Sequence, residues 1–252
     1  MRLPAGRGGP RRFWVAWALA VVLAVAAARL ASYAYRALPA PQPLEELSYY
    51  PSGQHLRPAT LGHWESAADL AWLRAVQYYG AHRQTDNSFV RMEHVFDILT
   101  SLSPHFLAAY IFGGFALAQE GRDFPAAERL MHKGLEGNPS SADLFFQLGF
   151  LYYVRPGGRD LRRAAECFEI ASNLPDAPPQ AARFAAYARL DAGDLYVSYQ
   201  LWSHAYQMTT NPYVREVAER EMQRIAQALA EGRREVVTRH LGTPQVQVGG
   251  GK

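Results

Sequence analysis

The chain has 252 residues, of which 26 are basic and 23 acidic, so its formal net charge is +3 at neutral pH. The charge is unevenly placed: residues 1–36 contain six Arg and no acid, and the remainder carries 20 basic against 23 acidic side chains. A mildly acidic body lacks the basic face that phosphate contacts require, so we expect no nucleic-acid partner. A hydrophobic content of 49% is ample for a core, and the single cysteine, Cys167, allows no internal disulfide.

The N-terminus has the pattern of a single-pass membrane anchor. Residues 1–12 are basic and are predicted to lie in the cytoplasm, and residues 13–35 form an apolar run interrupted only by Arg29. These 23 residues exceed the roughly 20 that a transmembrane helix needs. Arginines before the run and acids after it place everything that follows on the opposite side of the membrane. The alternative is a cleaved signal peptide, with Ala26 to Ala28 as the cleavage site and a soluble mature domain.

Residues 36–62 are predicted to be a linker between this anchor and a folded domain. Pro39, Pro41 and Pro43 favour a stiff, extended segment. The following stretch, from Ser48 to Gly62, is rich in turn-forming residues and is expected to have little regular structure.

Residues 63–212 repeat a helical pattern about four times. Prolines recur at Pro104, Pro139, Pro175 and Pro212, spaced by 35, 36 and 37 residues, and glycine-containing turns lie between them. A period of this length, built from a helix, a turn and a second helix, is typical of an α-solenoid. We therefore predict an all-α fold of about four helix-turn-helix repeats, with an ordinary helical bundle of accidental spacing as the alternative.

The best copy of the repeat begins at Ala142. Phe145, Leu148, Gly149 and Tyr152 share one helical face, because their spacings are three, four and seven residues. A second helix follows, with Ala164, Phe168 and Ala171 on one stripe. The preceding copy has Tyr110, Gly113, Gly114 and Leu117, then Ala127, Met131, Gly134 and Pro139; the following copy keeps Ser198, Trp202 and Ala205, and an upstream copy has Trp72, Ala75, Val76 and Tyr79, then Met92, Phe96, Leu99 and Pro104.

This pattern resembles the tetratricopeptide repeat family, in which an aromatic residue, Leu-Gly and a second aromatic precede a small–bulky–small stripe and a proline. The stretch from Tyr50 to Gly80 is also similar to membrane-proximal regions of some bacterial single-span tetratricopeptide proteins. The resemblance suggests a bacterial source. Together with the predicted anchor and its orientation, it leads us to expect an inner-membrane protein whose repeats lie in the periplasm. It brings no established activity with it.

The C-terminal part is predicted to close the solenoid. Asn211 and Pro212 form a helix start, and residues 213–241 are expected to form a capping helix, apolar on one face and charged on the other. Residues 242–252 are expected to be a flexible tail.

No set of residues predicts catalysis, so we expect neither an enzyme nor a bound cofactor or metal. The eight histidines are scattered, and the nearest group of possible ligands is Glu93, His94 and Asp97. Their spacing favours a solvated helix face, with a metal site, and hence an enzyme, as the alternative.

The expected function is protein binding by a membrane-anchored scaffold. In the tetratricopeptide family, the first helix of each repeat lines a concave groove that holds a peptide segment. Carried over to the matching copies, the groove residues are Ile111, Phe115, Asp143, Phe146, Phe150 and Tyr153. The alternative for each aromatic residue is packing against neighbouring helices. The alternative for the whole protein is a fixed accessory subunit of a larger membrane complex, bound through its other faces.

Overall fold

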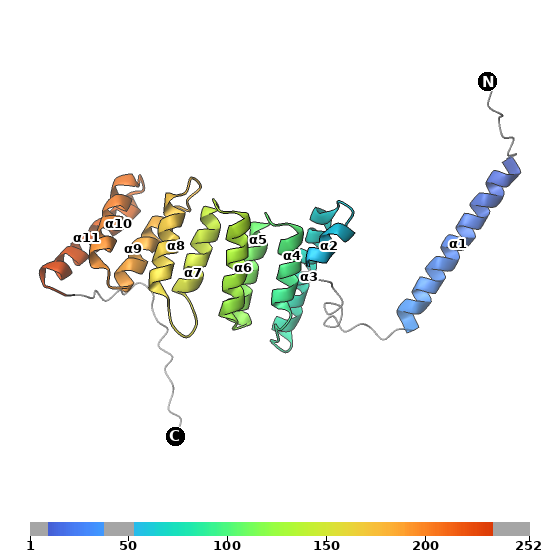
Figure 1. Cartoon of the computed structure of the whole chain (residues 1–252), viewed down its shortest axis with the longest axis horizontal. Helices are drawn as coiled ribbons and strands as arrows, with labels where there is room; N and C mark the ends of the chain where they lie inside the picture. Colours follow the sequence, from blue (N-terminus) through green and yellow to red (C-terminus); the bar gives the residue numbers. More distant parts are fainter. Residues whose placement is uncertain (1–9, 38–52, 234–252) are drawn as a thin grey trace, which may run out of the picture. The chain divides into compact units, whose positions relative to one another are not determined.

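The computed structural model describes residues 10–37 and 53–233, and all the regular structure in these ranges is helical. The chain divides into two compact units, Met1–Tyr50 and Pro51–Lys252. The first unit contains one described helix, α1 (Pro10–Ala37), and the described part of the second, residues 53–233, contains ten further α-helices (Figure 1).

Helix α1 has 28 residues, and the apolar side chains described in it, such as Trp14 and Leu30, are exposed. None of the helices in residues 10–37 and 53–233 combines the length and the hydropathy that crossing a membrane requires. The structure therefore does not support the membrane span predicted over residues 13–35. Most of the predicted basic N-terminus, residues 1–9, lies outside the described ranges.

The second unit is a stack of helix pairs in chain order, as Figure 1 shows. The first helices of the pairs are α3 (Trp64–Gln84), α5 (Leu107–Phe115), α7 (Ala142–Tyr153) and α9 (Ala181–Asp191); the second helices are α4 (Met92–Leu102), α6 (Phe124–Gly137), α8 (Leu161–Asn173) and α10 (Leu195–Met208). A short π-helical turn, Ala116–Glu120, extends α5. From α3 to α11, each helix packs mainly on its neighbours in the chain, so the predicted all-helical, sequentially stacked architecture is confirmed.

Glycine allows the two helices of a pair to pack closely. A Cβ atom added to Gly149 of α7 would lie 2.9 Å from the ring of Phe168 and 3.1 Å from the carbonyl oxygen of Ala164, both on α8. Gly134 of α6 faces Tyr110 of α5 in the same way, with its added Cβ 2.8 Å from that ring. In these two pairs a glycine of one helix therefore lies directly against an aromatic ring of the other.

Ion pairs join the second helix of one pair to the second helix of the next, and their two partners lie about one repeat length apart in the sequence. Glu93 of α4 and Arg129 of α6 lie 36 residues apart in sequence, with a carboxylate–guanidinium distance of 2.7 Å. Glu128 of α6 and Arg163 of α8 lie 35 residues apart, at 2.9 Å. Such exposed pairs add little stability. Their common offset shows that consecutive helix pairs stack in the same phase.

The predicted linker, residues 36–62, contains a helix that the sequence analysis did not expect. Helix α2 (Gly53–Ala59) packs against α4, and Gly53 lies so close to it that an added Cβ would be 2.4 Å from Cβ of Ser101. Only glycine, which has no side chain, fits at this contact between α2 and α4, although the sequence pattern suggested a turn. Residues 38–52 lie outside the described ranges.

Helix α11 (Pro212–Ala230) packs on α10 at the end of the described stack. The side-chain oxygen of Asn211 accepts a hydrogen bond from the Tyr213 amide at 3.0 Å, which caps the helix start as predicted. Val217, Ala218 and Ile225 are buried in a cluster with Trp202 of α10. The described helix ends at Ala230, before the predicted end at residue 241; residues 234–252, including the predicted tail, lie outside the described ranges.

Candidate protein-binding surface

Three phenylalanines from successive first helices form a continuous line of rings, which we call the aromatic row. Phe115 of α5 and Phe150 of α7 have ring centroids 5.9 Å apart, and Phe150 lies 5.9 Å from Phe184 of α9. Each ring is half-buried, so part of it remains accessible. These distances are typical of favourable aromatic pairs. The row brings together residues that are 35 and 34 positions apart in sequence.

Two of the predicted groove residues belong to the row, and two others lie beside it on the same helices. Phe115 and Phe150 are the row members that the sequence resemblance indicated. Ile111 is half-buried on α5, and Asp143 is exposed at the start of α7, where it accepts a hydrogen bond from Gln147 at 3.3 Å. These four residues are accessible to a partner.

Phe146 and Tyr153 are instead buried between helices, with exposed fractions of 6% and 5%. The Phe146 ring packs 5.2 Å from Phe168 and 5.4 Å from Phe184. Both rings are therefore largely inaccessible in this structure, and their predicted place in a binding groove stays a prediction. Helix α7 is aromatic on more than one face, and the structure shows that one of these faces is used to join α7 to α8 and α9.

The Tyr153 hydroxyl is part of a polar cluster that joins α7 to the next first helix. It donates a hydrogen bond to Oδ2 of Asp191 on α9 at 3.0 Å, and Arg159 reaches the same oxygen at 3.0 Å. Burial, followed by the negative charge of Asp191, raises the pKa of Tyr153 above its ordinary value. The phenol therefore stays protonated and serves as a structural donor.

Phe184 is the row member that sequence analysis missed. The alanine-rich sequence around it left the register of α9 open, because many small residues fit either face of a helix. The spacing from Phe115 to Phe150 to Phe184 was the signal that could have identified it. The structure determines the register by placing Phe184 against Phe150 and Phe168.

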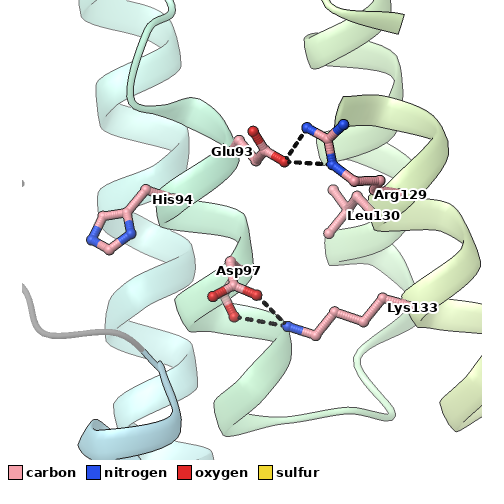
Figure 2. A pocket seen from close by; sticks show the side chains of 6 residues that line it. All are labelled: Glu93, His94, Asp97, Arg129, Leu130 and Lys133. Carbon is pink, nitrogen blue, oxygen red and sulfur yellow. Dashed lines mark hydrogen bonds and ion pairs between the residues drawn. The ribbon is translucent and has the colours of Figure 1, made fainter. Parts of the chain in front are cut away.

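The acidic side chains considered as a possible metal site are paired with basic side chains of the protein itself (Figure 2). Glu93 accepts two hydrogen bonds from the Arg129 guanidinium, and Lys133 Nζ lies 2.6 Å from Oδ1 of Asp97. His94 points away from both carboxylates. The pocket between these groups has a volume of about 420 Å³.

No group of three or more potential metal ligands occurs in the described ranges. The arrangement around Glu93 and Asp97 is that of partly exposed ion pairs between α4 and α6. These two carboxylates are therefore interpreted as structural.

A comparison of the sequence with protein families and with curated proteins finds no match to either. The fold and the surface described above define an all-α protein built from sequentially stacked helix pairs. The resemblance to tetratricopeptide repeats stays a prediction from the sequence pattern.

Proposed function

We propose that this chain is a non-catalytic helical-repeat scaffold that binds a segment of a partner protein across the aromatic row. The observation that carries the proposal is the row itself: Phe115, Phe150 and Phe184 place half-buried rings in contact on the first helices of three successive pairs. A peptide lying across the first helices would meet these rings in succession. We also propose that the stack is of the tetratricopeptide type, which the glycine contacts and the 35–36-residue offset of the ion pairs support.

Half-buried aromatic rings are suited to such binding for two reasons. They offer a large apolar contact area, and residues of this kind are prominent among those that dominate binding energy. Their neighbours already restrict them: Phe150 is held between Phe115 and Phe184. Little further side-chain freedom is lost on binding, so more of the contact energy contributes to affinity. The exposed carboxylate of Asp143, on the same helix as Phe150, would add a polar contact.

The proposal is tested by measuring how row substitutions change the affinity for an identified partner. The partner is first identified by crosslinking in intact cells and then purified. We expect Phe150→Ala to weaken binding about tenfold or more, since central aromatic anchors carry a large share of interface energy. Tyr196→Ala removes an exposed aromatic residue of α10 outside the row and serves as the control. Circular dichroism verifies that both variants are folded.

An unchanged affinity of folded Phe150→Ala would refute the role of the aromatic row. The same measurement on Phe115→Ala checks that the effect follows the row and does not come from one altered ring. If both substitutions leave binding intact while a third, on another face, abolishes it, the partner binds elsewhere.

The alternative proposal is a fixed accessory subunit of a larger assembly, joined through a surface away from the row. Leu70 and Leu73 of α3 favour it, because these large apolar side chains are 65% and 56% exposed. Native gel sizing after gentle detergent extraction distinguishes the two proposals. A large species that persists in Phe150→Ala but is lost in Leu73→Glu supports the alternative.

A further inference from the structure

A pocket of about 490 Å³ lies where α8, α9, α10 and α11 meet. Its volume is within the range of small-molecule sites in proteins. Its walls come from the last turns of α8 and α10, the connection at 177–179, the first turn of α9 and the start of α11. Among the described residues that line it, Arg183 and His204 are ionisable and none is Asp or Glu. The pocket is therefore positive in charge.

Arg183 has a buried hydrogen-bond donor that nothing in the described protein satisfies. Its Nε atom is shielded from solvent and has no hydrogen-bond partner within residues 10–37 and 53–233. Arg189, six residues later on the same helix, shows the usual arrangement: its guanidinium lies 2.6 Å from Glu169 and 3.2 Å from Asp194. An arginine that is not paired with a carboxylate in this way keeps its charge available to an anionic ligand. Carboxylates and phosphates match the planar guanidinium best.

The first turn of α9 adds a second source of positive potential to the same wall. The helix begins at Ala181, and its first hydrogen bond of the helical pattern runs from the Phe184 amide to the Gln180 carbonyl at 3.0 Å. The Gln180 side chain makes no capping hydrogen bond. The early amides of Ala182 and Arg183 therefore belong to an uncapped helix start, which favours negative charge.

The rest of the lining has no charge: it is apolar at positions such as Pro178, Ala205, Met208 and Val214, and polar at Ser172, Thr209, Thr210 and Asn211. An apolar wall does not favour a strongly hydrated dianion, because burying such an ion without enough donors is costly. One guanidinium beside apolar side chains instead matches a single negative charge attached to a short hydrocarbon chain.

We propose that this pocket binds a small organic monocarboxylate with a short apolar chain, whose carboxylate accepts hydrogen bonds from Arg183. The site uses different side chains from the aromatic row, so either proposal can fail while the other holds. Binding here would also bridge α8 to α11 and stabilise the C-terminal end of the described stack.

The test is calorimetric titration of the full chain with hexanoate, hexanamide and acetate. Hexanoate carries both the charge and the chain, and we expect a dissociation constant of roughly 0.1–1 mM, as its small size allows. Hexanamide, which lacks the charge, and acetate, which lacks the chain, should both bind more weakly. Arg183→Met keeps much of the side-chain volume and should weaken hexanoate binding about tenfold or more. Arg162→Met alters an exposed arginine of α8 and should leave the affinity unchanged.

Three results would each overturn the proposal: no saturable hexanoate binding, hexanamide binding as tight as hexanoate binding, or unchanged affinity in folded Arg183→Met. If Arg183→Met does not fold, the comparison of hexanoate with hexanamide on the unaltered chain still decides whether the site selects for negative charge. Raised thermal stability with hexanoate but not with hexanamide is the corresponding independent measurement.

Discussion

Gly149 and Gly80 are both glycines within helices, yet their replacement by alanine should change stability in opposite directions. A Cβ atom on Gly149 of α7 would lie 2.9 Å from the Phe168 ring. That ring is fully buried and is packed against Phe146, so it cannot move away freely. A Cβ atom on Gly80 of α3 would meet no other atom within 4 Å.

The expected magnitudes follow from these two environments. Alanine favours a helix over glycine by about 1 kcal/mol, and both substitutions share this gain. Overpacking a filled core costs about 1–3 kcal/mol, and only Gly149→Ala bears this cost. We therefore expect Gly80→Ala to raise the free energy of unfolding by up to about 1 kcal/mol. Gly149→Ala should be less stable than Gly80→Ala by about 1–3 kcal/mol, since the helix-propensity gain cancels in the comparison.

The measurement is urea unfolding of the full chain, followed by far-ultraviolet circular dichroism. The free energy of unfolding is fitted as a linear function of urea concentration, with one common slope for the two variants and the unaltered chain. Differences in the midpoint urea concentration then report differences in stability. Equal stability of Gly149→Ala and Gly80→Ala would show that α7 and α8 are not in close contact at Phe168, and it would refute the packing described for this pair.

Arg189→Met should lower the free energy of unfolding by about 2 kcal/mol, because it leaves the carboxylates of Glu169 and Asp194 without their shared partner. Lys133→Met breaks a more exposed pair and should cost less than about 1 kcal/mol, so equal losses in urea unfolding would contradict this ranking. Burial raises the pKa of the Cys167 thiol to about 12, so a thiol reagent should label the native chain only as fast as it unfolds, whereas labelling at the rate of a free peptide would show an open thiol. As the pH rises, the thiol of the unfolded chain ionises before the thiol of the folded chain. The free energy of unfolding should therefore stay constant below the ordinary thiol pKa of 9.0 and fall as the pH rises from there toward about 12. The membrane anchor predicted at residues 13–35 is tested by alkaline carbonate extraction: an anchored chain stays with the membranes at full length, and release into the supernatant contradicts the anchor.

Much of the local structure could be predicted because the signals are close together in sequence. The stripe of Ala164, Phe168 and Ala171 predicted a buried helix face, and all three are fully buried on α8. Asn211 was identified as a cap because its acceptor acts on an amide only two residues away. The repeat period also follows from sequence, since it depends on the spacing of prolines and glycines.

The binding surface could be predicted only in part, because α7 is aromatic on adjacent faces. Phe145 and Phe146 are neighbours of the same chemistry, and periodicity alone does not determine which one is buried. The structure buries Phe146 against Phe168 and leaves Phe145 half-buried. The register of α9 was open for a related reason, since an alanine-rich helix has no single apolar stripe.

Helix formation, the repeat length and the helix caps were thus determined by the sequence itself, because each depends on interactions within a few residues or on a regular spacing. Only the tertiary structure decided which charges pair and which do not. Glu93 meets Arg129 across 36 residues, while the Nε atom of Arg183 has no partner in the part of the chain that the structure describes. Such pairings depend on the distance between side chains on different helices, and a linear pattern of charges does not contain that distance.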